Sequence, residues 1–319
     1  MATAAAALYK TATSTAKRES LDDIIYQVDS DETPFISTVK KGTASAITEE
    51  WLVQELASAS ATNYVNEGSD TDYQAQTAHT RLTNVCMISQ KGISISGTLN
   101  EVKQAGVSNE MNYRQIIAGK ELRRDLEKYF TDGEVVKSGS DPRKSGAVST
   151  WLSNTSFGSG GAVPTGDGTD AGTAGTARAL TLALVEAAHA LAWNDGGSPT
   201  SLLLSATNKQ NFSALTSSVT NQLQMTSGKP VEGMHVGSVS VFLTDFGQLD
   251  VTMSRQLSND KALLIDYDWC EYRTLPNRNF AMKEMASTGD SMQKQLIVEG
   301  TLVMTAPKSS AQVLALNGS

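Results

Sequence analysis

The side chains of this chain that could perform metal or acid–base chemistry are few and scattered. Its three histidines are His79, His189 and His235. Glu186 stands three residues before His189 in an E-x-x-H pattern, and paired copies of this pattern on facing helices can bind a di-iron centre. We predict instead that His189 is a core or helix-face histidine. His235 follows Gly233-Met234 and is not expected to be a metal ligand.

Patterns typical of phosphate binding and nucleophilic catalysis are not found. The chain has no G-x-x-x-x-G-K-[ST] loop and no G-x-S-x-G elbow. Glu49 and Glu50 are adjacent, so on a strand they would point to opposite faces and could not act as a carboxylate pair. Asp167 and Asp170 do not have the spacing of an EF-hand loop. We therefore predict no enzymatic activity, no metal and no cofactor. An enzyme with an unrecognised site remains an alternative.

Composition excludes further classes. The net charge is −8, which is unsuitable for a dedicated nucleic-acid binder because phosphate contacts need clustered Lys and Arg. No apolar run approaches the ~20 residues of a membrane helix. Cys86 and Cys270 lie far apart in the sequence and are interpreted as buried thiols of a reducing compartment.

Residues 44–97 have the composition of a long, thin arm. Their ends, Ile47–Leu56 and Arg81–Ser96, are strand-like, and a polar stretch separates them. The arm carries six acids and two bases. A two-stranded ribbon is marginal in water by itself. We therefore expect a neighbouring molecule to supply the missing packing surface.

Residues 109–131 have the pattern of one amphipathic helix about 35 Å long. Ser108 or Asn109 can cap its start, Asp132-Gly133 can end it, and Gly119 should weaken or bend it. The apolar face is expected to contain Tyr113, Ile116, Ile117, Leu122, Leu126, Tyr129 and Phe130. The opposite, charged face is expected to contain Glu121, Arg123, Arg124, Asp125, Glu127 and Lys128. A shorter helix before it starts with a capping box, Thr98 to Glu101, and closes at Gly106.

The rest of the chain predicts a mixed α+β architecture. Pro34 should stop any preceding helix, and Phe35, Ile36 and Val39 should form a small apolar anchor. The glycine-rich residues 158–175 predict a flexible loop. Expected helices are Ala177–Trp193, capped by Thr176 and stopped by Asp195-Gly196-Gly197, and Asn208–Ser217. Expected strands are Ser201–Ser205, Val236–Thr244, Asp250–Met253, Lys261–Asp266, Phe280–Met285 and Met292–Thr305, the last with core residues Leu296, Val298, Leu302 and Met304.

Six stretches in a fixed order resemble a known family. They are 31–35 (DETPF); 49–51 (EEW); 96–98 (SGT) with Val102, Ala105 and Gly106; 121–127 (ELRRDLE); 245–247 (DFG); and 288–291 (TGDS) with 299–302 (EGTL). Their order and spacing are similar to those of the major capsid (head) proteins of tailed bacteriophages, of the Hong Kong 97 fold type. The resemblance covers residue 20 to the C-terminus.

The resemblance implies an α+β, Hong Kong 97-like capsid fold with defined parts. Residues 1–43 would be the N-terminal arm and 44–97 the extended E-loop, lying over a neighbouring subunit. Residues 98–159 would be the peripheral domain, with 109–131 as its spine helix. Residues 160–265 would be the axial domain, and 266–319 would return to the peripheral domain.

The implied function is a noncovalent head shell, icosahedral or prolate, around double-stranded DNA. Implied partners are copies of the chain in pentamers and hexamers, a portal protein, and scaffold and decoration proteins, with weak non-specific contact to packaged DNA and none to a membrane. The short arm implies a separate scaffold protein or self-assembly. Assembly would occur in the host cytoplasm and the product would be the virion capsid. Because residues 43–90 contain no lysine, we expect no covalent cross-link from the arm.

Particular residues are candidates for assembly roles. Contact candidates between subunits are Trp51, Tyr64, Tyr73 and Arg81, and hinge candidates are Gly92, Gly97 and Gly119. Alternatives are an encapsulin-type compartment of the same fold, which would need a cargo-binding groove, and a tail structural protein, which needs less helix.

Overall fold

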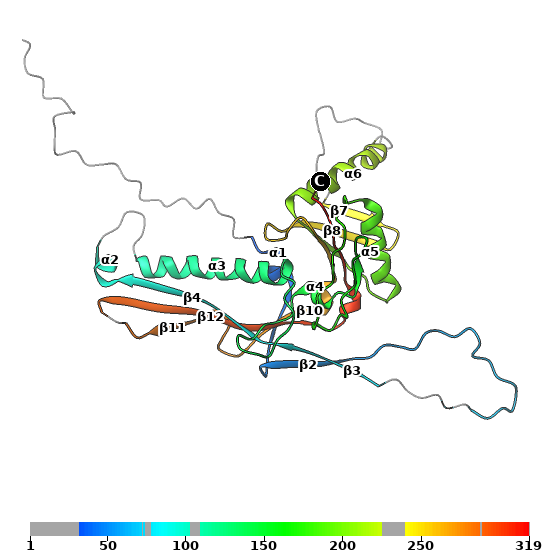
Figure 1. Cartoon of the computed structure of the whole chain (residues 1–319), viewed down its shortest axis with the longest axis horizontal. Coiled ribbons are helices and arrows are strands. Elements are labelled where there is room, and N and C mark those ends of the chain that lie inside the picture. Colours follow the sequence, from blue (N-terminus) through cyan, green and yellow to red (C-terminus); the bar gives the residue numbers. More distant parts are fainter. Residues whose placement is uncertain are drawn as a thin grey trace, which may run out of the picture.

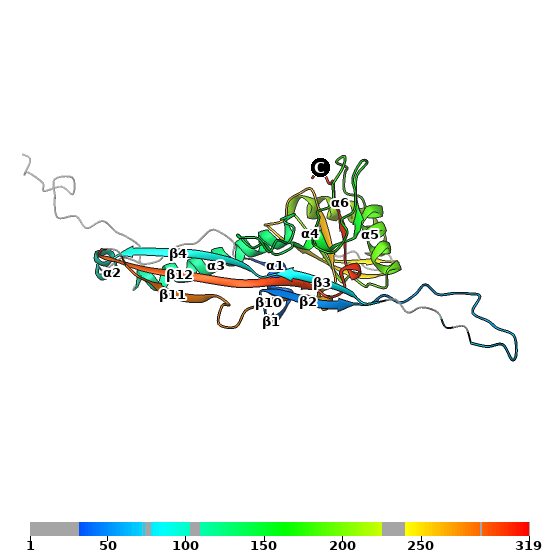
Figure 2. The ribbon, with the colours of Figure 1, turned by 60° about the horizontal axis from the view of Figure 1, so that its bottom comes forward.

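The structure is a computed structural model that describes residues 32–71, 73, 78–102, 109–224, 240–287 and 289–318; for 216–224 only the backbone is described. The chain is elongated (Figure 1). A long helix and a long sheet extend to one side of a more compact region, and a thin loop projects to the other side. A second view keeps this arrangement (Figure 2).

The long sheet has five strands arranged around β12 (Ser291–Met304). One edge of β12 pairs antiparallel with β4 (Met87–Ser96). The other edge pairs with β11 (Ala281–Met285) and then with β10 (Cys270–Thr274), and β1 (Lys40–Thr43) adds in parallel to β10. The predicted core positions of β12 are confirmed: Leu296, Val298, Leu302 and Met304 are all buried. The sheet therefore joins segments from both ends of the described chain.

Helix α3 (Glu110–Thr131) packs on this sheet along β4 and β12. Its predicted start and end are confirmed, because Asn109 Oδ1 accepts the Asn112 amide at 2.9 Å and Asp132 is the C-cap. The predicted faces are partly wrong. Ile116 is 61% exposed, whereas Glu127 of the expected charged face is fully buried. The buried stripe contains the predicted Leu122, Leu126 and Phe130, and it also contains Met111 and Ala118, which were not predicted.

Two short helices lie near predicted boundaries. Pro34 starts α1 (Pro34–Thr38), because proline fits the first helical position, where no amide donor is needed. The residues of any helix that Pro34 was expected to stop lie outside the described residues. Phe35, Ile36 and Val39 are buried as predicted. Helix α2 (Gly97–Glu101) is capped by Ser96, whose Oγ accepts the Leu99 amide at 3.3 Å, and not by Thr98. Gly106 and Ser108 lie outside the described residues.

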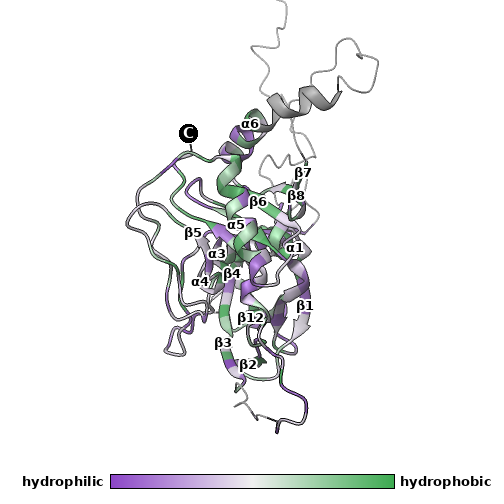
Figure 3. Cartoon of the chain, turned by 90° about the vertical axis from the view of Figure 1, so that its right-hand side faces the viewer, coloured by the Kyte–Doolittle hydropathy of each residue, from purple (hydrophilic) through white to green (hydrophobic). Residues whose placement is uncertain are grey.

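The compact region contains a six-stranded sheet with its own core. Its strands in spatial order are β5 (Asn154–Ser156), β13 (Ala311–Val313), β9 (Ala262–Ile265), β6 (Ser201–Leu204), β8 (Gly247–Met253) and β7 (Val241–Thr244). Helices α5 (Leu182–Asn194) and α6 (Ala206–Gln224) belong to this region, and Val185, Leu204 and Phe212 are among its fully buried residues. Figure 3 shows hydrophobic residues on α5 and on the strands in the middle of the molecule. Short helices α4 (Val148–Trp151), η3 (Tyr267–Trp269) and η4 (Pro307–Ser309) complete the chain.

Local boundaries in this region need two corrections. Helix α5 starts at Leu182 with Thr181 as its cap, not at Ala177 with Thr176, because Arg178 is held in extended form by backbone bonds to residues 315–317. The glycine-rich segment is irregular, as predicted, but it is not an open linker. Backbone bonds between Ala162 and Thr173, and from Gly158 to Ala174, close it on itself. The stop after α5 is confirmed, with Gly196 at φ 84°.

Candidate functional site

The projecting loop is the most exposed part of the described chain. Strands β2 (Thr48–Val53) and β3 (Thr80–Val85) pair antiparallel, with Thr48 opposite Val85. Every described residue from 54 to 79 is exposed, and Leu56, Tyr64, Val65 and Tyr73 are 79–94% exposed. The predicted ribbon is confirmed but shorter than expected, since β4 leaves it and pairs with β12 instead. Large apolar side chains that are exposed to water in this way indicate a surface that another molecule covers.

Asn84 fixes the base of the ribbon to the body. Its Nδ2 donates to Leu302 O at 2.6 Å and to Ser145 Oγ at 3.1 Å. Its Oδ1 accepts the amides of Val85 and Gly146, both at 2.9 Å. The side chain is fully buried, so each of these bonds replaces one that water would supply in the unfolded chain. Asn84 thus aims the ribbon by joining β3 to β12.

Glu49 secures the other strand of the ribbon. Its carboxylate accepts the amides of Ser45 (2.7 Å) and Ala46 (3.2 Å) and an Arg273 guanidinium N–H (3.1 Å). Burial by itself would raise the pKa of Glu49, but these hydrogen bonds together hold that pKa below its ordinary value of 4.5. Glu50 lies on the exposed face and pairs with Arg81 at 3.4 Å. The two acids therefore lie on opposite faces, as predicted.

Trp51 packs at the root of the ribbon against its own subunit. The centroid of its ring lies 5.4 Å from that of Trp151. Lys137 Nζ lies 5.4 Å from the centroid of the Trp151 ring and donates hydrogen bonds to Thr83 O and Asp167 O. The indole N–H of Trp51 has no hydrogen-bond partner within the described residues. Trp51 therefore has a packing role inside one subunit, whereas Tyr64 and Tyr73 are 79% and 90% exposed. The role of these residues between subunits stays a prediction.

The three hinge candidates have different surroundings. A methyl group added at Gly92 would meet nothing within 4 Å, and one at Gly119 would lie 4.0 Å from Leu296 Cδ2. One at Gly97 would lie 2.1 Å from Asp290 Oδ1. Only at Gly97 would an added methyl group therefore require a neighbour, the Asp290 carboxylate, to shift. Whether any of them is a hinge stays a prediction.

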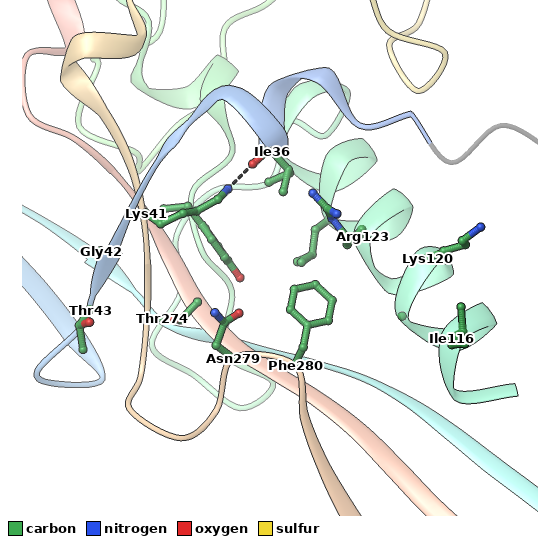
Figure 4. A pocket seen from close by; sticks show the side chains of 13 residues that line it. Ile36, Lys41, Gly42, Thr43, Ile116, Lys120, Arg123, Thr274, Asn279 and Phe280 are labelled. Atoms are coloured by element: carbon green, nitrogen blue, oxygen red, sulfur yellow. Dashed lines mark hydrogen bonds between the residues drawn. The ribbon is translucent and has the colours of Figure 1, made fainter. Parts of the chain in front are cut away.

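A pocket of about 660 Å³ opens between α1, β1 and α3. In Figure 4, Lys41 and Phe280 reach into it from opposite walls, and Lys120 lies at its rim with its amine directed away. Beneath the pocket, Glu127 accepts the amides of Phe35 (3.0 Å) and Ile36 (2.8 Å) and the hydroxyl of Ser254 (3.2 Å). Burial raises the pKa of Glu127, and these bonds oppose the shift. The acid thereby holds α1, α3 and the end of β8 together.

The described histidine and cysteine side chains that could perform chemistry are placed as follows. His189 is buried, and its Nδ1 lies 2.9 Å from Thr244 Oγ1. Burial lowers the pKa of His189, which is typical of a neutral core histidine. Cys86 and Cys270 are buried free thiols, as predicted. Glu232 and His235 form a second E-x-x-H pattern in the sequence, and both lie outside the described residues.

No catalytic arrangement emerges from the part of the chain that the structure describes. Its His, Cys, Asp and Glu side chains form no group of three suited to a metal ion. Among the described helices, none combines the length and apolar character of a membrane span. What this part does present is an anchored ribbon with an exposed end.

The whole arrangement has the Hong Kong 97-like fold of the solved shell proteins that it resembles. The cyanophage A-1(L) capsid asymmetric unit matches with a TM-score of 0.69 at 11% identity, covering 96% of this chain and 99% of that chain. A Mycobacterium phage Ogopogo chain matches with a TM-score of 0.60 at 13% identity (97% and 99% covered). The SrpI encapsulin of Synechococcus elongatus PCC 7942 shares the fold with a TM-score of 0.55 at 9% identity (98% and 97% covered).

The chain belongs to the SU10 major capsid protein family, whose family model matches residues 8–317. The major capsid protein of Escherichia phage Phieco32 is 30% identical over 118 residues. That match covers 37% of this chain and about a third of the length of the relative. The family resemblance seen in the sequence is therefore confirmed.

Proposed function

We propose that this chain is the major capsid protein of a tailed bacteriophage and builds the shell that encloses its double-stranded DNA. The observation that carries the proposal is the anchored ribbon ending in an uncovered loop, in a chain of a major capsid protein family. Such a loop gains packing only from another molecule, and repeated weak contacts close a shell through multivalency. Membership of a capsid family favours this reading over the encapsulin and tail alternatives.

The parts of the chain then have assembly roles. Residues 1–43 act as an N-terminal arm and 44–97 as the loop that reaches a neighbour. Residues 98–159 and 266–319 form the peripheral domain, and 160–265 the axial domain of pentamers and hexamers. Two hydrophobic clusters, one that includes α3 and one that includes α5, support a body with two parts. Their boundaries differ from this division, because Leu203 and Leu263 belong to the cluster of α3 and Val313 to the cluster of α5.

The wider partners follow from the same role. A portal protein would occupy one vertex, and scaffold or decoration proteins would assist a shell without covalent links. The acidic chain would contact packaged DNA weakly and without sequence preference. Assembly would take place in the host cytoplasm, and we propose no catalytic role.

Deletion of residues 58–78 tests the proposal. The anchors at Glu49, Trp51 and Asn84 remain, so the subunit should fold and stay soluble, but shells should not form. Negative-stain microscopy and sedimentation measure assembly, and thermal unfolding checks the fold. Normal particles from the deletion variant would show that this loop is not the assembly element.

A further inference from the structure

Three cations line the pocket between α1, β1 and α3. Lys41, Lys120 and Arg123 contribute to its walls, and none of the described residues that line it is an Asp or a Glu. In Figure 4 the amine of Lys41 and the guanidinium of Arg123 lie on either side of Ile36, at one end of the pocket. Because like charges held near each other repel, this end of the pocket favours a bound anion.

The two cations at that end keep hydrogen-bond donors for a ligand. Lys41 Nζ donates to the carbonyl of Ile36, and Arg123 donates to Ser37 Oγ at 3.3 Å. An ammonium has three N–H donors and a guanidinium five, so donors of both groups remain after these bonds. Burial, and then Arg123, lower the pKa of Lys41, while Glu127 raises it. Glu127 already accepts two amides and a hydroxyl, so a bound anion would supply the further counter-charge for this pair of cations.

Apolar side chains complete the pocket. The ring of Phe280 extends into it (Figure 4), and Ile116 of α3 lines it and is 61% exposed. Phe280 has a φ of 50°, a conformation that bulky residues rarely adopt and that is found more often at binding sites. A ligand with an anionic group next to an apolar part therefore fits this pocket.

The positive charge continues along α3 beyond the pocket. Lys120, Arg124 and Lys128 follow one another at intervals of four residues, and we call these three residues the basic row. This spacing places them on one side of the helix, with a rise of about 6 Å from each to the next. Lys120 lies at the rim of the pocket with its amine directed away from it, so the basic row begins where the pocket ends.

This basic surface belongs to a chain whose net charge is −8. Two acids lie beside the basic row, and both pair with Lys91 of β4, Glu121 at 3.7 Å and Asp125 at 2.8 Å. A single carboxylate could fill the pocket but would not reach the basic row, whereas a chain of regularly spaced anions reaches both. The backbone of nucleic acid is such a chain, and each of its phosphates is joined to a sugar that offers carbon atoms to an apolar wall.

We propose that the pocket and the basic row bind the phosphate backbone of DNA, with one phosphate between Lys41 and Arg123 and its sugar against Phe280. This inference rests on the proposed function for the identity of the partner, the packaged double-stranded DNA, and adds the surface that contacts it. Contacts to phosphate and sugar carry no sequence information, so the binding does not depend on sequence and weakens steeply as salt is added.

Binding of a short DNA duplex to the full chain, measured by fluorescence anisotropy, tests the inference. The logarithm of the binding constant falls with the logarithm of the salt concentration by about 0.9 for each phosphate contact. Arg123→Gln should therefore weaken binding about eightfold at about 0.1 M salt and lower this slope by about one, equally for duplexes of different sequence. Lys283→Gln is the matched control, because it removes one positive charge from β11, outside the pocket and the basic row, and should change the affinity by no more than about twofold. Thermal unfolding checks that each variant folds.

Protection of lysines from acetylation locates the site on the unmodified chain. Bound duplex should slow the acetylation of Lys41, Lys120 and Lys128, measured by mass spectrometry, and should leave that of Lys283 unchanged. This readout needs no substitution, so it holds even if a variant does not fold.

Several results would overturn the inference. They are an unchanged duplex affinity of Arg123→Gln and protection only of lysines elsewhere. The inference also fails if inorganic phosphate or a mononucleotide protects Lys41 and the duplex does not, because the ligand is then a small phosphate. Equal protection by polyglutamate would show that the surface is built for an acidic peptide. If the unmodified chain forms no shell, the proposed function fails, whereas duplex binding with protection of the same lysines would still support the DNA site.

Discussion

Glu127 is a fully buried residue of α3. Its carboxylate accepts hydrogen bonds from two backbone amides that lie about ninety residues earlier in the chain. These amides belong to the first turn of α1, where helix donors lack partners within the helix. The carboxylate thus acts as a remote cap. A buried acid of this kind is tolerated because several donors replace the water it has lost.

We predict that Glu127→Gln lowers the free energy of unfolding by about 1–3 kcal/mol. An amide group would replace one acceptor oxygen and face a buried donor, which leaves that donor unsatisfied. Urea unfolding of the subunit at neutral pH measures the change. Glu121→Gln on the same helix is the control, because Glu121 is exposed and 3.7 Å from Lys91, so its loss should cost less than ~1 kcal/mol. Equal effects of the two substitutions would contradict the capping role.

We predict that the contribution of Glu49 to folding stability is lost at acidic pH. Its pKa in the folded state is below its ordinary value of 4.5, so the folded state favours the charged form. Its contribution to stability is therefore complete above about pH 4.5 and is lost as the pH falls through the folded-state pKa. The stability advantage of the unmodified chain over Glu49→Gln should shrink over that range in urea unfolding at a series of pH values. A difference that does not change with pH would refute this.

Helix α3 is continuous through Gly119 although glycine is a weak helix former. The position has room for a methyl group, so packing does not require glycine there. Since packing does not explain this glycine, we propose that it lets the helix bend during assembly.

We predict that Gly119→Ala stabilises the isolated subunit by about 0.5–1 kcal/mol and impairs shell closure. Unfolding measures the first effect, and microscopy of particle size and completeness the second. Gly139→Ala is the control, because it adds the same methyl group in open space outside the helices and strands and should leave shell closure unchanged. If Gly119→Ala gives normal shells, Gly119 is not a hinge.

At the scale of the whole molecule, one chain presents both a projecting acidic loop and a cationic pocket. One core runs from α3 and β12 to Leu203 and Leu263 of the six-stranded sheet, and the other includes α5. The anchors at Asn84 and Glu49 set the direction of the loop. A subunit of this shape can contact several neighbours at once, which favours a closed shell built from individually weak interfaces.

The shell should be held without covalent links. The described loop residues include no lysine, and both thiols are buried and free, with burial raising the pKa of Cys86 to about 11. Particles boiled in detergent should therefore run as monomer on a denaturing gel, with or without reductant. A ladder of multimers would show that a cross-link exists.

Local patterns in the sequence determined many of the helices and strands of this protein. The bounds of α3, the Asn109 cap, the strand β12 with its core residues and the paired limbs of the ribbon all follow from periodicity and capping, which depend on residues a few positions apart. The family resemblance added the architecture. The candidate pocket was not predicted, because Lys41, Arg123 and Phe280 come from three distant segments and no local pattern links them.

Only the tertiary structure decided which partner each element takes. The sequence of β4 is equally suited to a ribbon and to a sheet, and its long register with β12 placed it in the sheet. Glu127 follows the charged pattern of an exposed face, but the amides of α1 make its burial favourable. Periodicity reports that a face is polar or apolar, whereas burial depends on what the rest of the chain brings against it.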